Sequence, residues 1–181
     1  MFVMHIRHLR RLMKEAEVSV HCSVENDDPA WHVDSAVLRS LFEAIVCETR
    51  RELSDIEGVH KAVALSCYVV KAGQMQALNR QYRQHDTATD MLSFPLGYGA
   101  PGRGWVLGDI IICLSEVKSK AHSSGNTLTD QFVFSLIHSF LHLLGYDHEL
   151  QQQRCLMERR EESIFAAIET TDDFSRIVES V

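Results

Sequence analysis

Residues 127–148 constrain the fold of this chain most tightly, because they combine an apolar helical segment with three histidines. Their sequence is TLTDQFVFSLIHSFLHLLGYDH, and its large apolar residues fall on nearly every side of a helix of about 3.6 residues per turn. A helix that is apolar all round is buried, so we predict that this segment is the central helix of the fold. Thr127 or Thr129 can cap its start, and Asp130 suits its first turn.

The histidines of this segment have the spacing of a metal site. His138 and His142 lie one helical turn apart, which places their Cβ atoms about 5–6 Å from each other on one face. Gly145 can end the helix and turn the chain back, so that His148 reaches the same point as a third ligand. Two histidines alone are more often core or surface residues, and the third one favours a metal. Three ligands leave a fourth position open to water, as in catalytic zinc sites.

The residue after the first histidine distinguishes between classes of metal hydrolase. In H-E-x-x-H proteases, a glutamate at this position is the general base. Here the position holds Ser139, whose hydroxyl is too weak a base to take a proton from water near neutral pH. The spacing therefore predicts a metal hydrolase with an open site, and Ser139 argues against a protease.

Length and composition indicate one soluble domain. The chain has 181 residues, 45% of them hydrophobic, which is enough to bury a core without disulfides. No apolar run approaches the roughly 18–20 residues that cross a bilayer. The five cysteines are widely spaced and form no C-x-x-C pair, which indicates buried thiols in a reducing compartment such as the cytoplasm. The net charge of −7 does not mark a nucleic-acid binder, so binding of RNA would require a locally basic cleft.

We divide the chain into a basic extension at 1–16, expected to be mobile or helical, a single domain at 17–170, and a tail at 171–181, expected to be frayed. Apolar runs predict strands at residues 17–24, 62–71, 91–96 and 105–114. Apolar stripes at helical spacing predict helices within 31–51 and at 74–83, 115–124 and 149–169, besides the histidine segment.

Several details of these elements are predicted as well. The strand at 91–96 is expected to end at Pro95 and to pair with 105–114 as an antiparallel hairpin. The expected helix caps are Asp34 or Ser35 and Ser115. In the last helix, Leu156, Ile164, Phe165 and Ile168 are expected on the apolar face. Its charged residues, Glu161 among them, are expected on a solvated face.

Arg83 ends the predicted helix at 74–83 and precedes the loop QHDTATD. An arginine in such a place is usually solvated or ion-paired. A role toward an anion is the less common alternative, and spacing alone does not establish it.

Three segments together resemble one family, the YbeY endoribonucleases of bacteria, which take part in ribosomal RNA maturation and ribosome quality control. The segments are LNRQYRQHDTATDMLSFP at 78–95, GDIIIC at 108–113 and HSFLHLLGYDH at 138–148, in the family's order. The last of these is the most specific, and GDIIIC alone would mean little. The resemblance extends over roughly residues 17–170.

The resemblance implies an α/β (α+β) domain with a small mixed sheet of about four strands packed by five or six helices, the central one carrying the first two histidines. It implies that His138, His142 and His148 bind one zinc ion per chain. It also implies a catalytic role for Arg83, which matches the arginine of the family's L-N-x-x-Y-R segment. Two positions depart from the family pattern. Ser139 replaces the usual glycine, and His85 replaces a common lysine and weakens the positive potential.

The leading hypothesis is a cytoplasmic, zinc-dependent endoribonuclease that prefers single strands. Its expected partners are ribosomal RNA and ribosomal or ribosome-assembly proteins, with neither DNA nor a membrane. In this hypothesis the ion activates water or polarises a phosphoryl oxygen, and Arg83 pairs with the scissile phosphate. Three candidates for the general base stay open: hydroxide held by the ion, a loop carboxylate such as Asp86 or Asp90, and the RNA's own 2′-hydroxyl.

Two rival functions share the same histidines. One is a non-enzymatic ribosome-assembly factor with a structural zinc, which would be closed by a fourth ligand such as Asp147 or Cys155. The other, less favoured because of Ser139, is a metalloprotease.

Overall fold

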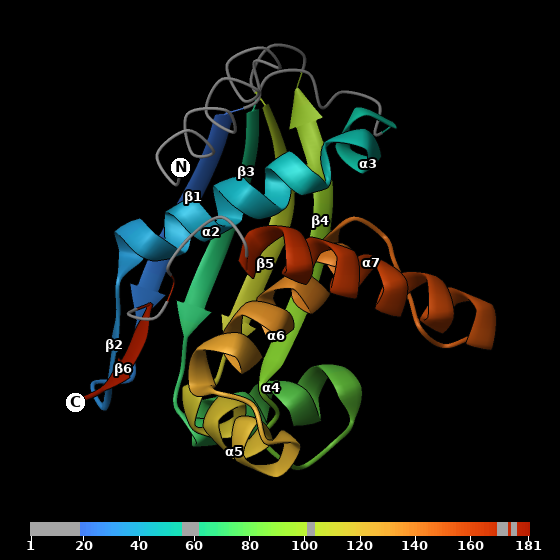
Figure 1. Cartoon of the computed structure of the whole chain (residues 1–181). Helices are drawn as coiled ribbons and strands as arrows, with labels where there is room; N and C mark the ends of the chain where they lie inside the picture. The colour runs from blue at the N-terminus through green and yellow to red at the C-terminus, as the bar shows by residue number, and fades with distance from the viewer. Residues whose placement is uncertain (1–18, 56–61, 101–103, 170–173, 175–176) are drawn as a thin grey trace.

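The computed structural model describes residues 19–55, 62–100, 104–169, 174 and 177–181 (Figure 1). The extension predicted at 1–16 lies outside them. Along the chain the elements are β1 (Ser19–Asn26), β2 (Trp31–Val33), α2 (Ser35–Glu48), α3 (Arg50–Asp55), β3 (Ala62–Val69), α4 (Ala72–Arg83), β4 (Met91–Ala100), β5 (Gly104–Ile112), α5 (Leu114–Ser124), α6 (Leu128–Leu143), α7 (Gln151–Glu169) and β6 (Val178–Ser180).

The main sheet has four strands in the order β1-β3-β5-β4. The pairs β1–β3 and β3–β5 are parallel, and β4 and β5 form the predicted antiparallel hairpin. Along β3, buried residues alternate with half-exposed ones, so one face of the strand lies on the core. The predicted small mixed sheet of about four strands is confirmed.

The strand that includes Pro95 is longer than predicted. β4 continues through Pro95 to Ala100, and Pro95 lies opposite Gly108 of β5. Since β4 is an edge strand of the sheet, a residue without a backbone N–H is tolerated there. Gly108 allows the two strands and α6 to approach closely: a Cβ at this position would lie 2.2 Å from the Phe94 carbonyl oxygen and 3.0 Å from Leu143 Cδ2.

The helix that carries the histidines is central, as predicted. In Figure 1, α2, α6 and α7 cross the same face of the sheet, and α6 also contacts α5. Five of its apolar side chains have no exposed surface: Phe132, Leu136, Ile137, Phe140 and Leu141. Burial of each such side chain contributes roughly 1.5–3 kcal/mol relative to exposure, so this helix anchors the core. Its start is capped by Thr127, whose hydroxyl accepts a hydrogen bond from the Asp130 N–H at 3.1 Å.

The end of the chain corrects one prediction. Val178–Ser180 form β6, which pairs antiparallel with β2, so the frayed tail expected at 171–181 is wrong for these residues. Phe174, Ile177 and Val178 are buried in the main core, and this apolar burial holds the tail against the domain. Strands of three residues carry too little periodicity to be predicted from a pattern.

Smaller corrections concern caps and cysteines. Asp34 caps α2 as predicted. The N-cap residue of α5 is Cys113, two residues before the predicted cap Ser115. All five cysteines are free thiols. The expected burial holds for three of them, whereas Cys47 is half-buried and Cys155 is exposed. Among the described residues, no helix is both long enough and apolar enough to span a membrane.

Candidate metal centre

Helix α6 exposes a single narrow stripe. From 131 to 143, every residue is buried except Phe134, His138 and His142, which recur at intervals of four residues. The three therefore lie one above another on one face of the helix. This stripe opens the buried helix to solvent at the point where the histidines lie.

The three predicted histidines come together. Their ring nitrogens lie within 4.8 Å of one another, in a group able to hold a metal ion. His138 and His142 face each other with 3.1 Å between their Nε2 atoms. The ring of His148 stacks on that of His138 with the ring centroids 5.5 Å apart. A turn outside the helix thus completes the group that the helix begins.

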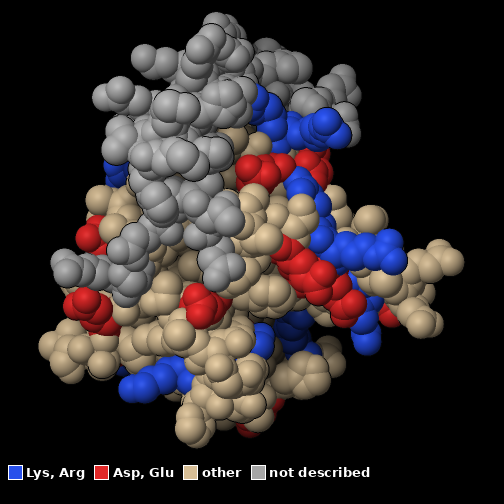
Figure 2. Space-filling view, viewed as in Figure 1, with Lys and Arg blue, Asp and Glu red and all other residues tan. Residues whose placement is uncertain are grey.

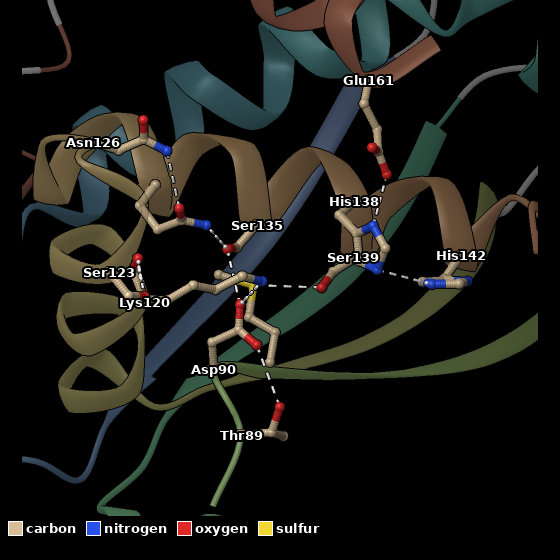
Figure 3. A network of polar contacts seen from close by, with 12 residues as sticks. Thr89, Asp90, Lys120, Ser123, Asn126, Ser135, His138, Ser139, His142 and Glu161 are labelled. Atoms are coloured by element: carbon tan, nitrogen blue, oxygen red, sulfur yellow. Dashed lines mark hydrogen bonds and ion pairs between the residues drawn. The ribbon is translucent and has the colours of Figure 1, made fainter. Parts of the chain in front are cut away.

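The other ring nitrogens of the first two histidines are already engaged. His138 Nδ1 lies 2.6 Å from the Glu161 carboxylate (Figure 3). His142 Nδ1 lies 2.9 Å from the Tyr146 carbonyl oxygen. Since a carbonyl can only accept, His142 donates through Nδ1, and a carboxylate favours the same tautomer in His138. Both Nε2 lone pairs then point toward one position.

This donor set fits a zinc ion. Two Zn–N bonds of about 2.0–2.1 Å at a tetrahedral angle separate their nitrogens by about 3.4 Å, close to the observed 3.1 Å. Burial lowers the pKa of His142 below its ordinary value, and the charges of His138, His148 and Arg83 act in the same direction against the Tyr146 carbonyl. The neutral imidazole, which is the form that binds metals, is therefore favoured near neutral pH.

The turn after α6 has the geometry predicted from Gly145. Gly145 adopts a φ of +91°, and its N–H donates to the His142 carbonyl. The Tyr146 N–H donates to the Leu141 carbonyl at 3.0 Å, which completes a Schellman motif. The Tyr146 hydroxyl lies 3.3 Å from the Glu52 carboxylate, which Arg160 of α7 also engages at 2.5 Å. These contacts between distant segments hold the turn that delivers His148.

Glu161 was misplaced by the sequence prediction. It was expected on a solvated face of α7, but only 4% of its surface is exposed. Met157, Ile164 and Ile168 are almost fully buried, and their spacing from Glu161 places all four on one face of the helix. Leu156, expected on the apolar face, is 61% exposed instead. The spacing of Met157 from Ile164 could have shown that the apolar face of α7 includes Met157 in place of Leu156.

Replacement of Glu161 with alanine is expected to weaken zinc binding by about 10–100-fold, because such outer partners fix the tautomer and orientation of a ligand histidine. Glu161→Gln keeps an acceptor for His138 Nδ1 and should lose less. The measurement is zinc affinity by competition with a chromogenic chelator. Glu162→Gln, at an exposed position on the same helix, is the matched control. Equal zinc affinity in Glu161→Ala and wild type would contradict a positioning role.

Arg83 is the last residue of α4 and is exposed. None of the described residues forms a hydrogen bond or ion pair with its guanidinium group, although its charge lowers the pKa of His142. Within the described part of the chain its donors are therefore unpaired, and its charge acts on one of the three histidines. The loop that follows is held by α4 itself: the Asn79 side chain donates to the Thr87 carbonyl at 2.8 Å, and Gln76 binds Asp86.

Asp90 fastens the other end of this loop to the histidine helix. Its carboxylate accepts from Lys120 of α5 at 2.8 Å and from Ser135 of α6 at 3.0 Å (Figure 3). Burial raises the pKa of Asp90, but the hydrogen bonds from Lys120 and Ser135 and the lysine charge outweigh it and hold the pKa below its ordinary value. Asp90 is therefore charged, and it fixes the loop to Ser135, which lies about one turn before His138 on α6.

The two rival functions find little support in this geometry. Ser139 is 2% exposed and its hydroxyl contacts the Met91 sulfur at 3.4 Å, so it offers no base to a protease reaction. In the part of the chain that the structure describes, no fourth side chain joins the three histidines. Cys155 is exposed, and the Asp147 carboxylate accepts the His148 N–H at 2.7 Å. A closed structural zinc site is thus not favoured.

A cleft of about 370 Å³ opens beside His138 and His148. Residues from α5, α6 and α7 line it, including Lys120, Phe134 and Arg154. The site therefore has room for a ligand next to the three histidines.

Fold and site together define a single-domain α/β protein in which a buried helix and the following turn present a three-histidine group suited to a metal ion. The chain belongs to the YbeY family: the family model described as Endoribonuclease YbeY matches residues 23–169.

Individual relatives agree with this assignment. A protein named Endoribonuclease YbeY from Moorella thermoacetica is 33% identical over 157 residues, which are 82% of this chain and 97% of the relative. One of the same name from Halorhodospira halophila is 39% identical over 113 residues, which are 61% and 73% of the two chains. The solution structure of TM1509 from Thermotoga maritima matches with a TM-score of 0.52 and 25% identity, over 82% of this chain and 92% of that one. The predicted family and fold class are confirmed.

Proposed function

We propose that this protein is a zinc-dependent endoribonuclease that cuts single-stranded segments of ribosomal RNA during ribosome maturation and quality control in the cytoplasm. The observation that carries the proposal is the pair of converging Nε2 atoms, 3.1 Å apart. The charge of the exposed Arg83 acts on His142, one of this pair. Membership of a family named for endoribonuclease activity supports the reaction class. Ribosomal and ribosome-assembly proteins are the further partners that we propose.

We assign a separate role to each residue of the site. His138, His142 and His148 would hold the ion, and Glu161 and the Tyr146 carbonyl keep the first two rings in the ligating orientation. When bound, zinc supplies Lewis acidity toward a phosphoryl oxygen and makes a water nucleophile available near neutral pH. Arg83 donates to the scissile phosphate and stabilises the negative charge that grows on it during cleavage.

The loop carboxylates are poorly placed to act as the general base. Asp90 accepts from Lys120 and Ser135. Asp86 is engaged by Gln76 and lies 3.7 Å from Arg80. We therefore assign the role of proton acceptor to solvent held in the cleft, and the attacking group is either water or the RNA's own 2′-hydroxyl.

The test is a cleavage assay on purified protein of known zinc content, with single-stranded RNA, duplex RNA, single-stranded DNA and casein as substrates. We expect cleavage of single-stranded RNA, loss of cleavage with a chelator, and recovery on addition of zinc. Zinc-loaded protein that cuts no RNA would support the assembly factor instead. Chelator-sensitive cleavage of casein would support the protease.

A further inference from the structure

Phe134 is the part of the exposed stripe that the proposed chemistry does not use. It is half-buried, lies one turn before His138, and lines the same cleft as His138 and His148. Its neighbours Phe132 and Val133 are buried in the core. Phe134 thus supplies the cleft with a large aromatic side chain, which is available to a ligand there.

The ring of Phe134 is held from α7. Phe165 packs against it edge to face, with ring centroids 6.2 Å apart and an interplanar angle of 62°. Met157, which is 1% exposed, lines the same cleft. A supported ring loses little conformational entropy when a flat ligand stacks on it, which is the property of a stacking platform.

Two cations line the same cleft. Lys120 is half-exposed, and its Nζ is held by Asp90 at 2.8 Å. Arg154 is exposed and its guanidinium lies 3.4 Å from the His148 carbonyl oxygen. Figure 2 shows basic side chains interspersed with acidic ones on the face it presents, among the residues coloured there. Glu158 and Glu161 line the cleft as well, and Glu161 is engaged by His138. The lining is therefore mixed in charge, and its two cations are placed to meet individual phosphates next to an aromatic ring.

We propose that Phe134 forms a nucleobase subsite beside the three-histidine site. An unpaired base of the RNA strand stacks on the Phe134 ring, and the adjoining phosphates meet Lys120 and Arg154. The inference rests on the proposed function and deepens it, because it names the group that selects single strands. Bases of a duplex are paired and stacked on each other, so a stacking platform of this kind accepts only unpaired ones.

The test compares Phe134→Leu, which keeps an apolar side chain, with Phe134→Tyr, which keeps the aromatic face. Binding of a short single-stranded RNA to each zinc-loaded protein is measured beside KM and kcat. Loss of one stacked base typically costs about 1–3 kcal/mol, so we expect at least about fivefold weaker binding and a raised KM in Phe134→Leu. Phe134→Tyr should bind as wild type does. Zinc content and thermal unfolding of each variant identify any general damage to the fold.

An abasic scan of the RNA isolates the stacking contact. One abasic nucleotide is placed at each position of the oligonucleotide in turn. At one position it should weaken binding to the wild type. At that position it should weaken binding to Phe134→Leu little further, because both changes remove the same interaction. Equal RNA affinity in Phe134→Leu and wild type, or additive losses at every position, would overturn the subsite. RNA cleavage by the wild type in that case would leave the proposed function intact, and its absence would refute the proposed function separately.

Discussion

Alanine in place of His138 is expected to abolish zinc binding and RNA cleavage together. The substitution removes one of three ligands and leaves the Nε2 atom of His142 without the nitrogen that faces it at 3.1 Å. The loss of zinc affinity should exceed the roughly 10–100-fold that removal of an outer partner costs. The measurement is zinc per chain by mass spectrometry after dialysis, beside cleavage of single-stranded RNA. His122→Ala, at an exposed position of α5, is the control.

A second variant separates metal loss from damage to the fold. His138→Ala leaves the buried Glu161 carboxylate without its imidazole partner, which should cost about 1–3 kcal/mol of folding free energy. His142→Ala leaves the Tyr146 carbonyl without the donor His142 Nδ1, and this carbonyl lies in a turn. Zinc should be lost from both variants, whereas the metal-free melting temperature should fall more in His138→Ala. Full zinc occupancy in either variant would show that the three histidines are not the ligand set.

The histidines and the glycine turn could be predicted because the contacts that matter there are local. His138 and His142 are one turn apart, and Gly145 supplies the positive φ that ends the helix, so sequence spacing and spatial distance agree. The resemblance to a known family added Arg83, which spacing alone would not have singled out. Membership of the family is now established, but the role of Arg83 stays a prediction.

The supports of the site could not be predicted in the same way. Asp90 meets Ser135 across 45 positions of sequence, and Arg160 meets Glu52 across 108. No periodicity connects such residues, because the sheet and the packing of α7 bring them together only in the folded chain. Glu161 could be predicted only in part. Its burial follows from its place on the apolar face of α7, but its contact with His138 depends on how α7 lies against α6.

Replacement of Arg83 with glutamate is expected to leave zinc content and melting temperature near wild type while RNA cleavage falls by about 10²–10³-fold or more, the cost of removing one donor that stabilises transition-state charge. The fold should be spared because Arg83 is exposed and none of the described residues pairs with it. Cleavage should fall because the charge of this guanidinium group acts on His142, and a carboxylate in its place repels the phosphate.

Three further substitutions, Arg83→Lys and the matched pair Arg80→Gln and Arg83→Gln, distinguish specific pairing from general attraction. Arg83→Lys keeps the charge but loses the planar fork that matches a phosphate, so it should recover only part of the activity. Arg80→Gln removes one positive charge from the same helix, where an exposed pair with Asp86 at 3.7 Å contributes little to stability. If Arg80→Gln lowers kcat as much as Arg83→Gln does, Arg83 acts only through the general field of α4. A loss confined to Arg83 means that its guanidinium group contacts the reacting phosphate.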